Sequence, residues 1–264
     1  MELQASVRAR WLGVFALSFG GLALGLSYFG MVHAGFTGFV GFTRTALSLL
    51  SLVTLLVPLV ALVVGAGAFG GERETQQLLV AQPLTRPELV AGRFLGLLAA
   101  LVAAQLLGFG LAGVWVALRA GSDGWIRYAA MVGLSWLLAA SCLSLGTWIG
   151  VASRERAHAL GAALAAWGGM VLVYDLVAMG VAVAAGSEAA RPLLVAMVLA
   201  NPVDLVRVMA LLAIGARESL GGPGAALVAA LQTFGGQILL PLAAAGWLGL
   251  PLVATWRAIE GQDF

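Results

Sequence analysis

Side chains able to do chemistry are scarce in this sequence, and the most unusual is Asp175, which lies beside Tyr174 inside a long apolar run. A carboxylate deep in a membrane is costly, and intramembrane acids usually face a cavity or a charged partner. One interpretation is that Tyr174 and Asp175 line a transport path or control a gate. The other is that Asp175 forms a structural pair with an arginine or a backbone amide toward the outer face. The sequence leaves both open.

A second polar group follows a break in the apolar pattern at Asn201-Pro202. The residue before a proline avoids the helical region, so we expect one helix to end there and another to begin. In the new helix Asp204 and Arg207 stand three positions apart, which places both side chains on one helical face. We predict that these four residues form a motif at the outer face of the membrane.

An intramembrane hydrolase is the enzymatic alternative, and the residue pattern speaks against it. One apolar run contains Ser135, Ser141 and Ser144. The two histidines, His33 and His158, fall outside the predicted spans, so neither can serve as a base for those serines. An aspartyl dyad needs two neighbouring carboxylates, and only one acid lies deep in a span. We therefore predict no catalytic residue and expect a non-catalytic subunit.

The sequence shows no pathway for a soft metal ion. Cu(I) prefers thiolate and thioether ligands, but Cys142 is the only cysteine and no two of the seven methionines are three or four residues apart. We predict a buried, inert Cys142, no metal site and no cofactor in this chain. The chain also lacks lysine, which a Walker A loop requires to reach the phosphates of ATP. Any ATP and Mg²⁺ must therefore bind a partner chain.

Membrane-spanning helices are the elements that must position these residues. Hydrophobic residues make up 61% of the 264 positions and charged residues only 10%, unlike a soluble domain. About 20 apolar residues cross a bilayer as a helix. We therefore expect an all-α integral membrane protein with six spans in a single transmembrane domain, residues 1–264. The predicted spans are residues 11–32, 46–70, 94–118, 126–152, 159–185 and 235–256.

The segment between the fifth and sixth spans, residues 187–224, needs its own interpretation. Residues 192–200 are apolar but too short to span a bilayer, and the chain breaks before residues 203–214 resume a helical pattern. We predict short interfacial or re-entrant helices at the outer face. The alternative is one broken span over residues 192–214, which would give seven spans and move the C-terminal tail to the other side.

Arginine placement gives the predicted orientation, because cytoplasmic segments of membrane proteins carry an excess of positive charge. With the N-terminus inside, the inner segments hold eight of the 14 arginines and the outer segments hold six. Half of the outer set lies in the long segment, where the rule counts least. The two termini and the segments 71–93 and 153–158 are therefore predicted to be cytoplasmic.

A polar segment of 23 residues, 71–93, separates the second and third predicted spans. Its apolar residues are interleaved with charged ones, and Pro83 and Pro87 divide it into short pieces. A turn between two helices needs only a few residues, so this segment indicates contact with a cytoplasmic partner. The alternative is that its amphipathic pieces lie on the membrane surface. In the first case leucines fill a groove and charged residues form its rim: Leu78, Leu79 and Leu84, with Glu72, Arg73, Glu74 and Arg86.

Residues 79–86, Leu-Val-Ala-Gln-Pro-Leu-Thr-Arg, followed by Glu-Leu-Val-x-Gly-Arg at 88–93, resemble the first cytoplasmic loop of ABC-2 type transporter permeases. In that family the loop forms a coupling helix that docks on the ATPase subunit. A shorter second coupling segment is matched in position by residues 153–156. The resemblance implies two short cytoplasmic coupling helices. The ATPase-coupling residues that it implies are Glu72, Arg73, Glu74, Leu78, Leu79, Pro83, Leu84, Arg86, Arg154, Glu155 and Arg156.

A narrower resemblance rests on residues 199–207, Leu-Ala-Asn-Pro-Val-Asp-Leu-Val-Arg, together with Tyr174-Asp175-Leu176 and a short charged tail. These features resemble the permeases of transporters that mature nitrous oxide reductase. The resemblance implies a homodimer in the bacterial inner membrane, two cytosolic ABC ATPase subunits and a periplasmic accessory protein. It further implies a role in assembling the copper–sulfur centre of the reductase, by exporting a sulfur species or by transmitting motion.

Two other functions stay open at the level of the sequence. One is an ABC-2 permease for a drug, a lipid or a polysaccharide. The other, from a different class, is a membrane scaffold or a secondary transporter without an ATPase, although the inverted repeats of many secondary transporters are not evident. Membrane lipid is an expected partner in each case, and nucleic acid is not.

Overall fold

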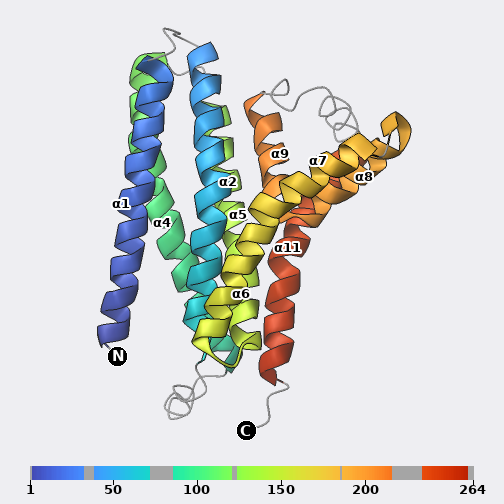
Figure 1. The fold of residues 1–264 in the computed structure, drawn as a ribbon. Helices are drawn as coiled ribbons and strands as arrows, with labels where there is room; N and C mark the ends of the chain where they lie inside the picture. Colours follow the sequence, from blue (N-terminus) through green and yellow to red (C-terminus); the bar gives the residue numbers. More distant parts are fainter. Residues whose placement is uncertain are drawn as a thin grey trace.

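The computed structural model describes residues 2–32, 39–71, 86–120, 124–184, 186–215 and 234–260, and every regular element within these ranges is a helix (Figure 1). A π-helical turn, η1 (Gly169–Val173), joins α6 to α7. In chain order the α-helices are α1 (Glu2–Val32), α2 (Phe39–Phe69), α4 (Arg86–Ala120), α5 (Trp125–Ala152), α6 (Arg156–Gly168), α7 (Tyr174–Ala184), α8 (Gly186–Ala200), α9 (Pro202–Ile214) and α11 (Phe234–Glu260).

Five helical segments are long and apolar enough to cross a membrane, and they correspond to the second to sixth predicted spans. The first predicted span lies in α1, a helix of 31 residues whose apolar portion, Gly13–Tyr28, is shorter. An all-helical membrane fold is therefore confirmed, while the count of six spans and the coupling helices stay predictions. The five segments are Thr45–Phe69, Glu88–Val114, Trp125–Ala152, Arg156–Val181 and Ile238–Ile259.

The helix α5 is central to the bundle, because it packs against α2, α4, α6, α9 and α11. Two of the three serines considered as nucleophiles connect it to its neighbours. Ser135 Oγ donates to Gln105 Oε1 of α4 at 2.7 Å, and Ser144 Oγ donates to the Leu248 carbonyl of α11 at 2.7 Å. Both serines are buried. Their hydroxyl groups thus act as links between helices, which membrane proteins commonly use.

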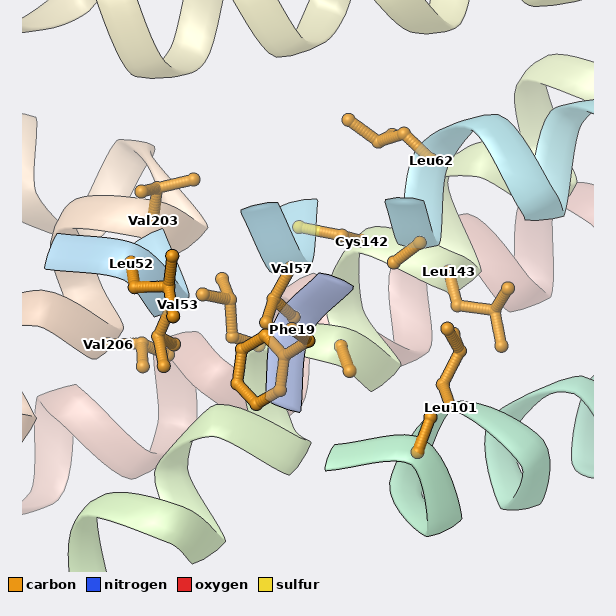
Figure 2. Packing of buried hydrophobic residues seen from close by; sticks show 14 of the residues in the cluster. Phe19, Leu52, Val53, Val57, Leu62, Leu101, Cys142, Leu143, Val203 and Val206 are labelled. Carbon is orange, nitrogen blue, oxygen red and sulfur yellow. The ribbon is translucent and has the colours of Figure 1, made fainter. Parts of the chain in front are cut away.

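Buried side chains from several helices meet in one main core. The ring of Phe19 packs edge-on against that of Phe109, with the centroids 5.1 Å apart. Cys142 has no exposed surface, which confirms that its thiol is buried. Between membrane helices, close packing of this kind contributes more than the release of water. Figure 2 shows members of this core from α1, α2, α4, α5 and α9: Phe19, Leu52, Val53, Val57, Leu62, Leu101, Cys142, Leu143, Val203 and Val206.

Glycines allow α2 and α5 to approach each other closely. A Cβ atom on Gly146 would lie 2.6 Å from the carbonyl oxygen of Leu62, and one on Gly150 would lie 2.8 Å from that of Ala66. These distances are too short for any side chain. The pair Gly146 and Gly150, four residues apart, is therefore a small-residue contact of the kind that lets membrane helices touch through their backbones.

The helices α8 and α9 meet at Asn201, where the chain bends by 110° between residues 192–200 and 202–214. The bend lies about halfway along α11, because Trp247 Nε1 donates to the Leu199 carbonyl at 3.0 Å. From the bend both helices extend toward the same end of the molecule (Figure 1). The sharp bend agrees with both alternatives for residues 192–214, a re-entrant pair of helices and a broken span, and the choice between them stays a prediction.

The first described helix begins, and the last one ends, at the same end of the bundle (Figure 1). The α5–α6 turn lies at that end too, as do the end of α2 and the start of α4. This agrees with the prediction that both termini share one side with the segments 71–93 and 153–158. The side of the membrane that they face stays a prediction.

Candidate functional site

Asn201 forms the turn around which the candidate site is built. Its backbone is extended (φ −128°, ψ 118°), and its side-chain oxygen accepts a hydrogen bond from the Val203 N–H at 3.0 Å. This bond caps the N-terminus of α9. Pro202 follows in the first helical turn, where the missing N–H is tolerated. At the other end Gly215 closes α9 with a left-handed backbone (φ 77°).

Arg207 lies between two carboxylates. Its Nη1 atom is 2.9 Å and 3.0 Å from the two oxygens of Asp175 in α7, and 3.0 Å from Asp204 Oδ1 one turn earlier in α9. The side chains are 29% exposed for Arg207, 12% for Asp204 and 45% for Asp175. Charge-assisted contacts at these lengths are strong. They join α7 to α9 through one guanidinium and two acids.

Two further hydrogen bonds attach η1 and α7 to the bend between α8 and α9. Asn201 Nδ2 donates to the Met170 carbonyl in η1 at 2.8 Å and to Asp204 Oδ2 at 3.2 Å. Tyr174 Oη donates to the Met197 carbonyl in α8 at 2.8 Å. The structure therefore brings the two predicted sets of residues together. We call Tyr174, Asp175, Asn201, Asp204 and Arg207 the polar cluster.

A hollow of about 290 Å³ lies beside Arg207, between α2 and α9. Two hydroxyl groups of α2 face it, and each donates to its own helix: Ser51 Oγ to the Leu47 carbonyl and Thr54 Oγ1 to the Leu50 carbonyl, both at 3.1 Å. The hollow thus combines apolar walls with hydroxyl groups and a guanidinium that is already paired with acids. Its lining residues are Leu47, Leu50, Ser51, Thr54, Arg207 and Leu211.

The pairing of Asp175 with Arg207 bears on the two interpretations that the sequence left open for Asp175. The structural interpretation expected an arginine or a backbone amide as the partner, and the structure shows Arg207 in contact with Asp175. A role of Tyr174 and Asp175 in transport or gating stays a prediction. Within the described ranges, no three His, Cys, Asp or Glu side chains gather as a metal ion would require, so we assign no metal ligands.

The end of the bundle at which α2 ends and α4 and α6 begin carries the residues predicted to couple to an ATPase. Arg86 begins α4, Arg154 and Glu155 lie in the exposed turn after α5, and Arg156 begins α6. Glu155 Oε2 lies 3.4 Å from His158 Nδ1 in an exposed pair, which contributes little to stability. The remaining predicted coupling residues lie outside the described residues: Glu72, Arg73, Glu74, Leu78, Leu79, Pro83 and Leu84.

The two predicted coupling segments are connected through the helices that flank them. Gly71, just after α2, has a left-handed backbone (φ 74°), and a Cβ atom there would lie 3.0 Å from the Arg156 nitrogen of α6. The guanidinium carbon of Arg93 in α4 lies 5.0 Å from the centroid of the Phe69 ring in α2, a cation–π contact. The chain therefore enters and leaves the first segment next to the start of the second.

Sequence reasoning found the polar side chains of the cluster and missed their backbone partners. The carbonyl groups of Met170, Met197 and Leu199 accept hydrogen bonds from polar or indole side chains, and no residue type marks such a carbonyl. The π-helical turn was also missed. Its one signal is the pair Gly168-Gly169 in the middle of an apolar run, because consecutive glycines weaken a helix.

Comparison with known proteins assigns the family. Residues 2–248 match a family model described as "ABC-2 family transporter protein". Two relatives carry the name "Probable ABC transporter permease protein NosY". The one from Pseudomonas aeruginosa is 35% identical over 214 residues, which cover 79% of this chain and 78% of that protein. The one from Stutzerimonas stutzeri is 32% identical over 270 residues, which cover 97% of this chain and 94% of that protein. By the extent of these matches, the chain belongs to the ABC-2 family of transporter permeases.

Proposed function

We propose that this chain is the permease subunit of an ABC transporter that supports assembly of the copper–sulfur centre of nitrous oxide reductase. The observation that carries the proposal is the similarity, along 97% of the chain, to a relative named as a NosY permease. An ABC-2 permease works with an ATPase and in a dimeric arrangement. For this chain we propose a homodimer in the bacterial inner membrane with two cytosolic ATPase subunits.

The proposed mechanism begins at the ATPase. Binding of ATP closes the pair of ATPase subunits and displaces the segments 72–93 and 153–158, which carry the coupling residues. The packing of Gly71 against Arg156 and of Arg93 on Phe69 supports this step. Because these contacts join α2, α4 and α6, a push on either segment reaches all three helices.

At the other end, the proposed output is a rearrangement around the polar cluster that a periplasmic accessory protein receives. The output is either an exported sulfur species or motion alone. The charge of the cluster favours motion, because the guanidinium of Arg207 already faces the carboxylates of Asp175 and Asp204 and offers little attraction to a sulfur anion. A copper ion is not the proposed cargo. Soft ions prefer sulfur ligands, and this chain has one cysteine and no two methionines three or four residues apart.

The direct test is the metal content of the reductase. Nitrous oxide reductase would be purified from the native host with this gene deleted, and from the same strain with the gene restored, and assayed for copper and sulfide. We expect the deletion strain to yield reductase that lacks its copper–sulfur centre and keeps its other copper site. A fully loaded, active reductase from the deletion strain would contradict the proposal.

Two observations would redirect the proposal. A loaded reductase together with co-purification of an ATPase would support an ABC-2 permease for a drug, a lipid or a polysaccharide. Absence of an ATPase from the purified complex would support a membrane scaffold or a secondary transporter. In a secondary transporter, Asp175→Asn should abolish coupling to an ion gradient, whereas in an ABC permease transport should depend on ATP.

A further inference from the structure

The hairpin of α7 and α8 projects from the rest of the bundle (Figure 1). The two helices pack against each other, and large apolar side chains of α7 are exposed, with Leu176 71% and Met179 69% exposed. We call α7 and α8 together the arm. Its contacts with α11 are near the bend at Asn201, where Val198 joins a small core with Leu240 and Ala244.

The chain departs from regular α-helix at the base of both helices of the arm. A hydrogen bond joins these two places, which are η1 and Asn201. On the α7 side, η1 forms a π-helical turn in which the Tyr174 N–H donates to the Gly169 carbonyl, five residues back. On the α8 side, Asn201 is extended. The Asn201 side chain spans the two points by donating to the Met170 carbonyl. Single π-helical turns inside α-helices occur frequently at functional sites.

The parts of the molecule on either side of this base are fixed to the bundle. Below it, α6 packs against α2 and α5, and Trp167 Nε1 donates to the Leu55 carbonyl of α2 at 3.0 Å. Beside it, α9 is anchored in the main core, where Val203 and Ile214 have no exposed surface. The arm therefore begins where both of its helices depart from anchored elements.

One ion pair holds the base of the arm to the anchored part. Asp175, in the first turn of α7, contacts Arg207 of α9 at 2.9 Å. Asp175 is 45% exposed and Arg207 29% exposed, so the pair lies at the surface of the helix bundle.

We propose that the arm is a lever that swings about a paired hinge, formed by Gly169–Val173 and Asn201, and that the Asp175–Arg207 ion pair is the latch that holds it against α9. Nucleotide-driven movement of α2, α4 and α6 as one unit would open the latch and move the arm, while α6 stays on α2. The proposal rests on the ATPase-driven part of the proposed function and does not depend on which protein or cargo the arm serves.

The test measures two distances by pulsed electron paramagnetic resonance in the full complex with its ATPase. Cys142 is the only cysteine, so Cys142→Ala gives a background for pairs of spin labels. One pair joins Leu107→Cys in α4 with Leu164→Cys in α6, and the other joins Leu107→Cys with Met179→Cys in α7. All three sites are exposed, at 64%, 49% and 69%. Labelled chains are diluted with unlabelled ones, so that distances within one protomer dominate.

We expect the α4–α7 distance to change between the ADP-bound and the ATP-trapped complex while the α4–α6 distance stays constant. If both distances change together, the fifth span moves as one rigid rod and the hinge does not exist. If neither changes while the ATPase turns over ATP, the arm is static. Either result overturns the proposal.

The hinge can be stiffened without steric conflict. A Cβ atom on Gly168 or Gly169 would meet nothing within 4 Å, so Gly168→Ala with Gly169→Ala fits the fold and removes backbone freedom. We expect this variant to lose most of the α4–α7 change. Matched controls are Gly161→Ala in α6 and Gly180→Ala in α7, whose added Cβ atoms also meet nothing within 4 Å. Equal loss in the controls would contradict a localised hinge.

The latch has its own variant. Asp175→Asn keeps the shape of the side chain and removes its charge, so we expect the α4–α7 distance in the ADP state to broaden toward that of the ATP-trapped state. An unchanged ADP-state distance would show that the ion pair does not hold the arm. A complex whose arm moves but which does not affect copper loading of the reductase would contradict the reductase role alone.

Discussion

At the residue scale, Arg207 is the residue on which the polar cluster depends. It contacts Asp175 across 32 positions of sequence and Asp204 across three. Without Arg207, the carboxylate of Asp204, which is only 12% exposed, would lose its cation and face the second acid. Without Asp175, the pair between Arg207 and Asp204 would remain. The two partners are therefore not equivalent, although each contributes to the same contact.

This asymmetry predicts the effect of removing either charge. Arg207→Gln should lower the stability of the purified complex by about 1–3 kcal/mol, because a largely buried carboxylate loses a charge-assisted partner. Asp175→Asn should cost less, since Arg207 and Asp204 keep their own ion pair in that variant. Thermal unfolding in detergent compares the two. Equal losses, or a larger loss for Asp175→Asn, would contradict the assigned roles.

The sequence predicts the members of this cluster but not the way they meet. A charged side chain in an apolar run is conspicuous, and so is Asn-Pro between two helical patterns. Their proximity depends on the bend at Asn201, which returns α9 alongside α7. The acceptors of Asn201 and Tyr174 are backbone carbonyls, and carbonyls are common to all residues, so no pattern of residue types could have identified them.

At the scale of single elements, two glycine pairs of identical spacing have different surroundings. An added Cβ atom on Gly92 or Gly96 in α4 would meet nothing within 4 Å, whereas one on Gly146 or Gly150 in α5 would meet backbone atoms of α2. Spacing places both members of a pair on one helical face, but it cannot say which helix that face meets. Which pair forms a contact is decided by the arrangement of the whole bundle.

The contact between α2 and α5 predicts a large effect from one methyl group. Gly146→Ala would place its Cβ atom 2.6 Å from the Leu62 carbonyl oxygen, so the helices must separate. Overpacking of this kind costs about 1–3 kcal/mol. Gly133→Ala is the matched control, because it lies in the same helix and its Cβ atom would meet nothing within 4 Å.

Thermal unfolding of the purified complex again provides the measurement. We expect Gly146→Ala to unfold several degrees lower than the parent protein and Gly133→Ala to unfold at the same temperature or slightly higher, since alanine favours helix over glycine. If both variants unfold alike, the close approach of α2 and α5 does not contribute to stability as we infer.

At the scale of the whole molecule, apolar length predicts the class of fold. Runs of at least 20 apolar residues become membrane helices because a backbone in lipid must satisfy its own hydrogen bonds. This accounts for the second to sixth predicted spans. The same rule cannot describe α8 and α9, which are too short to span and hold their positions through contacts with α5 and α11. The positions of α8 and α9 follow from tertiary packing and cannot be predicted from a local sequence pattern.

The position of α4 between the two ends of the bundle provides a test of coupling. Arg86 begins this helix and Arg119 lies near its other end. In the complex with the ATPase, Arg86→Glu should uncouple ATP hydrolysis from movement of the arm, because it reverses a charge in the predicted docking segment. Arg119→Glu should leave coupling intact. Hydrolysis rates measured beside the spin-label distances report the outcome, and equal behaviour of the two variants would argue against docking at Arg86.

The contact between Trp247 and the Leu199 carbonyl also constrains how the protein is made. The ribosome completes α8 and α9 before α11, yet α11 supplies part of the surface on which their bend rests. Until α11 is in place, the bend between α8 and α9 therefore lacks one of its supports, although α9 can already pack against α2 and α5. Packing around the bend is therefore completed only after the last helix has been inserted. The contacts that α11 supplies are thus the last to form beside the polar cluster.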